Sequence, residues 1–341
     1  MQNDKTNRRW VLAERPKGEP SDSTLRMETA EIPVAGAGEM LLRTQYLSLD
    51  PYMRGRMNDA KSYAPPVAIG EEMCGQTVSE VVASNLEGYA VGDIVLGWGG
   101  WQDYAVSDGE GVRNLGRDPQ HPSWTLGVLG MPGFTAWAGL KEIGQPQPGE
   151  TLVVAAATGP VGATVGQIGK IMGCRVVAVA GGPEKCAFGV ETLGFDACLD
   201  HRAEDFAEQL AAATPDGIDI YFENVGGKVL DAVIPLLNEN ARVPVCGIVS
   251  QYNLTEAPEG PDRLNWLMGN ILRKKLTVRG FIIWHTFGHL YDAFAAEMTP
   301  WVESGKVQYR EDLVEGLENA PRAFVEMLRG DSFGKRVIMV G

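Results

Sequence analysis

The sequence predicts an α/β protein that combines a doubly wound parallel sheet with a second, β-rich domain. From residue 151 onward, apolar runs of strand length alternate with segments whose apolar residues recur at helical spacing. In the first third of the chain, short apolar runs are separated by glycine-rich turns, which is typical of a compact, partly closed β domain. A length of 341 residues leaves room for both domains.

The first third contains the strands expected for the β domain. Residues 40–47 form an apolar run that Asp50 and Pro51 end. Further strands are expected at 69–82, at 93–96 and within 97–106. Near the C-terminus, the sequence predicts a helix after Pro321 and a last strand at 335–340. These last elements could either extend the parallel sheet or return to the β domain.

The second part of the chain alternates strands and helices in the order that a crossover-connected parallel sheet requires. Strands are expected at 151–157, 175–180, 196–199, 218–222, 242–248 and 276–282. Helices are expected at 161–172, 184–193, 203–212, 227–237, 262–274 and 286–304.

A glycine-rich turn joins the first of these strands to the first helix. Gly159, Gly162 and Gly166 follow the apolar run in the spacing G-x-x-G-x-x-x-G. Glycines allow the backbone to approach a pyrophosphate, and a helix N-terminus offers free N–H groups and the positive end of its dipole. Because the turn lies within a strand–helix–strand unit, it predicts a dinucleotide site, although such turns also occur without one.

The end of the second strand indicates which dinucleotide is bound. NAD-binding domains place a carboxylate there, on the adenosine ribose. Here the strand ends in Ala180-Gly181-Gly182-Pro183, Glu184 already belongs to the next helix, and Lys185 follows. A missing acid beside a lysine favours the 2′-phosphate of NADPH. The alternative is that Lys185 is an ordinary solvated helix lysine.

Charge and composition exclude several classes of protein. A net charge of −14 argues against nucleic acid or an anionic membrane as the main partner. The N-terminus lacks the apolar segment of a signal peptide, and no apolar run has the length of a membrane span. Five scattered cysteines indicate reduced thiols, and we therefore expect a cytoplasmic protein.

The sequence predicts no metal site. A catalytic zinc ion needs about three Cys, His or carboxylate ligands. The first 150 residues contain one cysteine, Cys74, and one histidine, His121, and no C-x-x-C pair occurs anywhere. His285 and His289 are four residues apart, which is a possible metal-binding spacing, but no third ligand is evident.

Seven segments, spread over nearly the whole chain, carry a family resemblance. They are NRRWVLAERP (7–16), YLSLDPYMRGRM (46–57), GVLGMPGFTAW (127–137), VVAAATGPVGATVGQIGK (153–170), GIDIYFENVGG (217–227), PVCGIVSQYN (244–253) and GLENAPRAFVEMLRGDSFGK (316–335). In these segments the sequence resembles the zinc-independent medium-chain dehydrogenase/reductases, in the branch of leukotriene B4 12-hydroxydehydrogenase/prostaglandin reductase. The resemblance implies a GroES-like, partly closed β-barrel catalytic domain, residues 1–128 completed by 310–341. It also implies a Rossmann-type NADP-binding domain, residues 129–309, and a homodimer.

The same resemblance implies a set of cofactor-binding residues. They are Thr135, Gly159, Pro160, Val161, Gly162, Gly182, Lys185, His201, Asn224, Cys246, Gly247, Ile248, Val249, Ser250, Tyr252, Phe281, Ile282, Ile283 and Ser332. Two of them depart from the family pattern, because His201 replaces a tyrosine and Ser332 replaces an asparagine.

The implied reaction is the NADPH-dependent reduction of a carbon–carbon double bond conjugated to a ketone, as in curcumin-type enones. Hydride goes to the β-carbon and a proton to the α-carbon, and the negative charge that develops on the carbonyl oxygen has to be stabilised. The resemblance places Tyr252 beside the nicotinamide ribose and makes it the first candidate for this role. Tyr52 and Tyr63 are the next candidates, and Arg54 is either an enolate stabiliser or one half of an interdomain ion pair.

Two other functions remain open at this point. The chain could reduce quinones or lipid-derived enals with the same cofactor. It could also be an NADP-binding structural or regulatory protein, which would bind NADPH tightly without turning over an enone.

Overall fold

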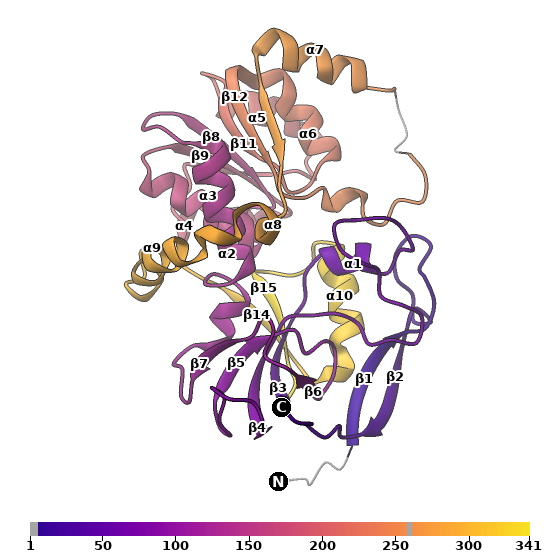
Figure 1. Ribbon diagram of the computed structural model, residues 1–341. Helices are drawn as coiled ribbons and strands as arrows, with labels where there is room; N and C mark the ends of the chain where they lie inside the picture. The colour runs from indigo at the N-terminus through magenta and orange to yellow at the C-terminus, as the bar shows by residue number, and fades with distance from the viewer. Residues whose placement is uncertain (1–5, 258–260) are drawn as a thin grey trace. The chain divides into compact units, whose positions relative to one another are not determined.

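Residues 6–257 and 261–341 are described by the computed structural model, and the chain divides into two units (Figure 1). One unit is discontinuous and contains the residues up to Gly127 together with Glu311–Gly341. The other is Val128–Arg310. Within the described residues, no helix is both long enough and apolar enough to cross a membrane.

The Val128–Arg310 unit is built on a six-stranded sheet in which every neighbouring pair is parallel, in the order β10-β9-β8-β11-β12-β13. This is the doubly wound, Rossmann-type arrangement that the sequence predicts, with the first strand in the middle of the sheet. The strands are β8 (Thr151–Ala155), β9 (Arg175–Ala180), β10 (Ala197–Asp200), β11 (Ile218–Phe222), β12 (Leu237–Val245) and β13 (Thr277–Gly280).

Helices cover both faces of this sheet (Figure 1). Val153 and Ala155 of β8 belong to the apolar cluster that includes Phe206 and Val229. Leu152 points to the opposite face, where its side chain fills the space beside Gly169. The helices are α2 (Met131–Ala138), α3 (Pro160–Ile171), α4 (Pro183–Glu191), α5 (Phe206–Ala213), α6 (Gly227–Val233), α7 (Leu264–Lys274), α8 (Ile283–Phe287) and α9 (Tyr291–Glu303).

The predicted bounds of three elements in this unit are wrong. The helix expected at 227–237 ends at Val233, and a short 3-10 turn, Ile234–Leu236, follows it. Pro235 lies in this turn and has no N–H group to continue an α-helix. Strand β12 begins at Leu237 and ends at Val245, whereas the sequence predicts a strand at 242–248. Residues 246–248 therefore lie beyond the end of the strand. The helix expected at 286–304 is likewise divided into α8, a 3-10 turn and α9.

The discontinuous unit contains a mainly antiparallel seven-stranded sheet in the order β14-β15-β3-β4-β5-β7, with β6 paired to β3, and a separate β1-β2 ribbon. Strand β15 pairs antiparallel with β3, with Ile338 opposite Leu47. The C-terminal segment therefore returns to the β-rich unit and does not extend the parallel sheet. The elements are β1 (Thr6–Leu12), β2 (Leu25–Glu31), β3 (Met40–Ser48), α1 (Tyr52–Arg56), β4 (Thr77–Ser84), β5 (Ile94–Gly97), β6 (Tyr104–Ser107), β7 (Arg113–Gly116), β14 (Glu311–Glu315), α10 (Ala320–Leu328) and β15 (Lys335–Met339).

The strand expected at 69–82 is only partly present, because β4 begins at Thr77. The preceding residues instead bond to the β1-β2 ribbon. Leu12 donates its N–H to Glu71 at 2.9 Å, and Met73 donates to Trp10 at 2.9 Å. Residues 71–73 thus pair with β1, which local apolar content cannot reveal.

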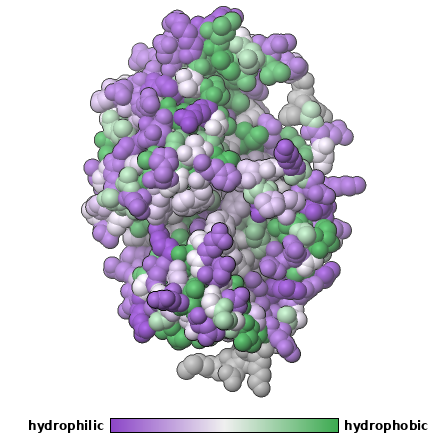
Figure 2. Space-filling view, in the orientation of Figure 1, coloured by the Kyte–Doolittle hydropathy of each residue, from purple (hydrophilic) through white to green (hydrophobic). Residues whose placement is uncertain are grey.

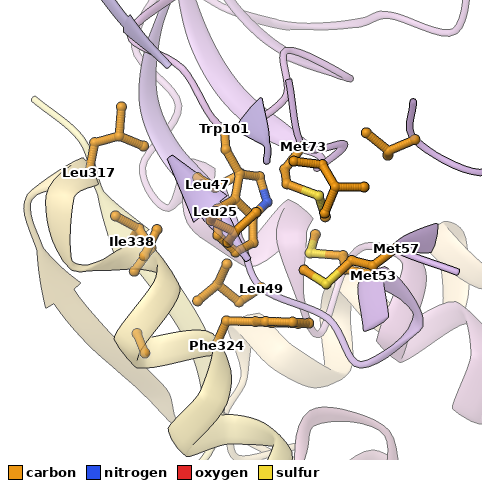
Figure 3. Packing of buried hydrophobic residues seen from close by; sticks show 14 residues of the cluster. Leu25, Leu47, Leu49, Met53, Met57, Met73, Trp101, Leu317, Phe324 and Ile338 are labelled. Carbon is orange, nitrogen blue, oxygen red and sulfur yellow. The ribbon is translucent and has the colours of Figure 1, made fainter. Parts of the chain in front are cut away.

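The core of this unit joins its two chain segments (Figure 3). Trp101 is fully buried and meets Phe324 of α10 edge to face, with ring centroids 5.6 Å apart. Leu47 and Leu49 from the N-terminal segment pack in the same cluster as Ile338 from β15. Burial of this shared apolar surface holds the C-terminal helix and strand in the unit.

Candidate active site

The turn between β8 and α3 is shaped so that only glycine fits at position 162. A Cβ on Gly162 would lie 2.3 Å from the carbonyl oxygen of Ala156, which is far inside van der Waals contact. Ala156 itself has a left-handed backbone, with φ of 51°, a costly conformation for a residue other than glycine. The turn therefore brings the first turn of α3 unusually close to the end of β8.

The start of α3 presents N–H groups to an anion. Pro160 is the first helical residue and has no N–H of its own, and Ala163 donates to Gly159 at 2.9 Å. An α-helix leaves the N–H groups of its first residues without intrahelical partners. The N–H groups of Val161 and Gly162, at the positive end of the helix dipole, therefore suit a pyrophosphate.

A cluster of cationic side chains lies at the carboxyl ends of β9 and β10. The position of a Cβ on Gly181 is 3.1 Å from Nε2 of His201 and 3.3 Å from the Arg202 guanidinium. Burial lowers the pKa of His201, and the nearby charges of Arg202, Lys228 and Lys185 lower it further, against the opposing effect of Asp200. The fields of three cations thus converge on one imidazole, and the cluster suits a phosphate group.

Asp200 organises this cluster. Its Oδ1 accepts the N–H of Arg202 at 2.9 Å, and its carboxylate also accepts the N–H of Gly182. Burial alone would raise the pKa of Asp200, but these hydrogen bonds and the charges of His201 and Arg202 lower it. Gly182 has φ of 92° and precedes α4, so the carboxylate anchors a turn whose backbone favours glycine.

The ends of β11 and β12 place Asn224 and the 246–252 segment at the same edge of the sheet. Asn224 donates its side-chain amide to the carbonyl oxygen of Ala155, at the end of β8, at 2.8 Å. Cys246 donates its N–H to Glu223 at 3.0 Å, and Ser250 donates to Val225 at 3.1 Å. These bonds fold the segment back over the end of β11.

The Tyr252 hydroxyl lies against the backbone of Gly247. The position of a Cβ on Gly247 is 3.1 Å from the phenolic oxygen and 3.7 Å from the carbonyl oxygen of Asn224. The absence of a side chain at 247 therefore gives the phenol its place near Asn224. Cys246 precedes this glycine, and burial, together with the charge of Glu223, raises the pKa of its thiol to about 12. This thiol is protonated at neutral pH, which makes it a poor nucleophile.

The remaining predicted residues of this unit have packing roles of their own. Thr135 is buried in α2, and its hydroxyl donates to Met131 at 2.7 Å. The ring of Phe281 packs in the core against Phe222, with centroids 6.4 Å apart. Ile282 lies at the start of α8, where its N–H donates to the hydroxyl of Thr286 at 3.3 Å, and Ile283 is buried. Phe281, Ile282 and Ile283 directly follow β13, which ends at Gly280.

Tyr52, Tyr63 and Ser332 belong to the discontinuous unit and not to the parallel sheet. The Tyr52 hydroxyl is buried and has no hydrogen-bond partner among the residues that the structure describes. Burial raises the pKa of this phenol well above its usual value, and the charges of Asp50, Cys74 and Tyr63 add to the effect. Because of this raised pKa, Tyr52 remains a neutral donor at physiological pH. Tyr63, by contrast, is 47% exposed.

Arg54, expected to be either an enolate stabiliser or one half of an interdomain ion pair, is only 3% exposed. Its guanidinium donates to the carbonyl oxygen of Gly18 at 2.7 Å and to Oδ1 of Asn58 at 2.7 Å. Both partners belong to the same unit as Arg54. Through these bonds the side chain ties the 16–18 loop to α1.

Sequence reasoning missed part of the cation cluster. Arg202 directly follows His201, but Lys228 lies 43 residues after Lys185 in the numbering, and only the fold brings it to His201. A usable signal was that Lys228 is a basic residue after a strand end at the same edge of the predicted sheet, where ligands of such sheets bind.

Comparisons with known proteins give the family. The model described as "N-terminal domain of oxidoreductase" matches residues 8–115, and the one described as "Zinc-binding dehydrogenase" matches residues 160–302. The chain is 63% identical to the NADPH-dependent curcumin reductase of Escherichia coli, over 98% of this chain and 97% of that one. It is 39% identical to prostaglandin reductase 1 of Rattus norvegicus, over 96% and 98% of the two chains.

The chain belongs to the medium-chain dehydrogenase/reductase family, in its prostaglandin reductase branch. The crystal structure of CurA from Vibrio vulnificus in complex with NADPH has the same fold, with a TM-score of 0.96 and 60% identity over 98% of this chain and 99% of that chain.

One of the two matching family models is described as zinc-binding, which raises the question of whether this chain has zinc ligands. Among the residues that the structure describes, no three His, Cys, Asp or Glu side chains are grouped so that they could hold a metal ion. The described residues of this medium-chain dehydrogenase/reductase therefore do not fit a zinc site. Its glycine turn and cation cluster do fit a dinucleotide with an extra phosphate.

Proposed function

We propose that this protein is an NADPH-dependent reductase of the carbon–carbon double bond of α,β-unsaturated ketones, including curcumin-type enones. Two observations together support the proposal. The chain is 63% identical to a curcumin reductase over nearly its full length, and it has the glycine turn and the cation cluster described above. NADPH supplies the hydride that goes to the β-carbon of the enone.

The chain's own residues would bind and orient the cofactor. The N–H groups of Val161 and Gly162 suit the pyrophosphate, and Lys185 and Arg202 suit the 2′-phosphate. Asn224 and the 246–252 segment lie further along the same edge of the sheet, where they would hold the nicotinamide half. We include His201 in the adenosine site, because its ring lies among the cations, whereas Ser332 remains a proposal on the resemblance alone.

Tyr252 is our proposed donor to the carbonyl oxygen of the substrate. Its hydroxyl has a defined place beside Gly247 and near Asn224. A phenol donates a hydrogen bond without ionising at neutral pH, and can stabilise the enolate oxygen that develops during hydride transfer. Tyr52, whose buried hydroxyl has no partner within the described part of the chain, is our second candidate, because such a group costs free energy unless a ligand satisfies it. Tyr63 is the third.

We expect Tyr252→Phe to lower kcat for an enone by about 100-fold, the usual effect of removing one oxyanion donor. The affinity for NADPH should change little. Stopped-flow measurement of NADPH oxidation would separate the hydride-transfer step from cofactor binding. The matched control is Tyr89→Phe, whose hydroxyl only donates to the carbonyl oxygen of Val112, and which should keep wild-type kinetics. Unchanged kcat in Tyr252→Phe would remove this tyrosine from the mechanism.

We expect the cation cluster to set the preference for NADPH over NADH. Lys185→Ala and Arg202→Ala should each weaken NADPH binding by about tenfold, the usual value of one charged hydrogen bond, and leave NADH binding nearly unchanged. Fluorescence titration with both cofactors measures this. Lys275→Ala, which removes a surface partner of Glu239, serves as the control. Equal affinities of the wild-type protein for the two cofactors would contradict the assignment.

The activity itself is tested by following NADPH oxidation with curcumin, a short alkenal and a quinone under identical conditions. We expect turnover of curcumin with consumption of its double bonds, detected by mass spectrometry as the addition of two hydrogen atoms per bond. Faster turnover of the quinone, or tight NADPH binding without turnover of any of the three compounds, would reject the proposed function.

We also propose that the protein works as a cytoplasmic homodimer. Its five cysteines are free thiols, which fits a reducing compartment. Strand β13 is an edge strand of the parallel sheet and is exposed along its whole length. Leu264, Met268 and Leu272 are exposed on the preceding helix α7, and hydrophobic residues lie at the top of Figure 2, where Figure 1 draws α7. An open edge beside apolar side chains favours pairing with a second copy.

We expect Val278→Lys, in the middle of β13, to convert the dimer to a monomer, because a lysine on an edge strand opposes edge-to-edge pairing. Analytical ultracentrifugation would measure the mass of the particle. Leu313→Lys on β14, the exposed edge strand of the other sheet, is the matched control and should leave the dimer intact. Dissociation by the control alone would move the interface to β14.

A further inference from the structure

The thiols of Cys186 and Cys198 are hydrogen-bonded to each other. Cys186 lies in α4 and Cys198 in β10, and both side chains are half-buried. Gly189, one turn after Cys186, allows this close approach: a Cβ at position 189 would lie 3.1 Å from the sulfur of Cys198. Two thiols from different elements therefore meet where helix and strand pack most closely.

This thiol pair is adjacent to the cation cluster in both sequence and space. Cys186 directly follows Lys185, and Asp200 and His201 come two and three residues after Cys198. The charge of Asp200 acts on both thiols. Asp200 also accepts the N–H of Gly182, at the start of α4. A change in the distance between the two sulfurs would therefore displace the turn at Gly182 and Lys185, the lysine that we assign to the 2′-phosphate.

We propose that Cys186 and Cys198 form a reversible intramolecular disulfide on reaction with small-molecule disulfides, and that this disulfide weakens NADPH binding. The effect on NADPH rests on the proposed function, whereas the formation of the bond does not. The two cysteines belong to the same chain, so the bond needs no partner chain. Neither cysteine is part of the hydride-transfer machinery proposed above.

The chemistry is a pair of thiol–disulfide exchanges. One cysteine thiolate attacks the small disulfide, forms a mixed disulfide with half of it, and releases the other half as a thiolate that takes up the proton. The second cysteine then attacks the sulfur of the first and displaces the remaining half. Two protein thiols are oxidised to one disulfide, and one small disulfide is reduced to two thiols. Burial raises the pKa of both cysteines, so the first step is expected to be slow.

We expect the new bond to shift α4 relative to β10. A disulfide has an S–S length of about 2.05 Å, much shorter than a hydrogen-bonded sulfur contact. We expect the approach of the sulfurs to draw the first two turns of α4 toward the strand. Lys185 is in the first turn, and the geometry of a charged hydrogen bond to phosphate is lost with a small displacement.

The test uses the full-length protein incubated with oxidised glutathione at mildly alkaline pH, followed by intact-mass analysis and peptide mapping. We expect the loss of two hydrogen atoms and a cross-linked peptide that joins Cys186 to Cys198. The affinity for NADPH, measured by fluorescence, should fall by about tenfold, as for the loss of one charged hydrogen bond, and recover after treatment with dithiothreitol.

Three variants make the result specific. Cys186→Ser and Cys198→Ser should each prevent both the cross-link and the loss of affinity, and circular dichroism would check that each variant folds. Cys174→Ser, at a buried thiol outside the pair, should behave like the wild-type protein. Persistent separate glutathione adducts, no change in mass, or a cross-link that leaves NADPH affinity unchanged would each overturn the proposal. Failure of the reduced enzyme to turn over any enone would instead reject the proposed function.

Discussion

Gly162→Ala is expected to abolish measurable NADPH binding. The added methyl group would lie 2.3 Å from the carbonyl oxygen of Ala156 and 2.8 Å from Cα of Ala157, and both contacts are with backbone that has no rotamer to change. The start of α3 must therefore move away from the end of β8. The N–H groups of Val161 and Gly162 would move with it, and we expect a loss in NADPH affinity of more than about 100-fold.

The same substitution should lower the stability of the parallel-sheet unit by about 1–3 kcal/mol, the usual cost of overpacking a closed site. Fluorescence titration with NADPH and thermal denaturation of the apo protein measure the two effects separately. The control is Gly269→Ala in α7, where a Cβ would meet nothing within 4 Å. Alanine is a better helix former than glycine, so this control should retain or raise stability. Wild-type NADPH affinity in Gly162→Ala would exclude the turn as the pyrophosphate site.

The sequence alone predicts the parallel sheet well and the β-rich unit less well. Strands 175–180 and 218–222 are found within their predicted bounds, because each is a buried apolar run between glycine- or proline-rich turns. Leu237–Val245 was not recognisable as one strand. Its first half contains Asn238, Glu239 and Asn240, and its strand conformation depends on pairing in the sheet instead of local composition.

The candidate site divides in the same way. The glycine turn and Lys185 carry local signals, since backbone close approach and a missing acid can be recognised within one strand–helix–strand unit. The approach of Lys228 to His201 depends on packing between elements that are far apart in the sequence. The Tyr252 hydroxyl lies 3.1 Å from the position that a Cβ on Gly247 would take, and although the two residues are only five positions apart, no local rule predicts this contact.

Lys335→Met is expected to be the most destabilising substitution in the discontinuous unit. Nζ of Lys335 donates to Oδ1 of Asp50 and to the carbonyl oxygen of Leu49, each at 2.7 Å. The two charged side chains are 1% and 6% exposed, and Ser48 donates its hydroxyl to the other carboxylate oxygen. Burial lowers the pKa of Lys335, and the charge of Asp50 opposes this effect. Removing the ammonium leaves a buried carboxylate without its counter-ion.

We expect a loss of about 3–5 kcal/mol in the free energy of unfolding, as for other buried ion pairs that lose one partner. Urea denaturation followed by tryptophan fluorescence would measure it, since Trp101 lies in the core of the same unit. The surface variant Lys275→Met, which removes a solvent-exposed pair with Glu239, should unfold at nearly the wild-type urea concentration.

The double variant Lys335→Met/Asp50→Leu decides between two explanations of that loss. If the cost arises from the orphaned charge, the double variant should recover most of the stability, because an apolar pair of similar volume can replace a buried ion pair. If it arises from lost packing around the lysine stem, the second substitution should add to the damage. We expect recovery, because Lys335 joins β15 to the end of β3 through charge and hydrogen bonds, while apolar contacts of Ile338 and Phe324 already join the two segments independently.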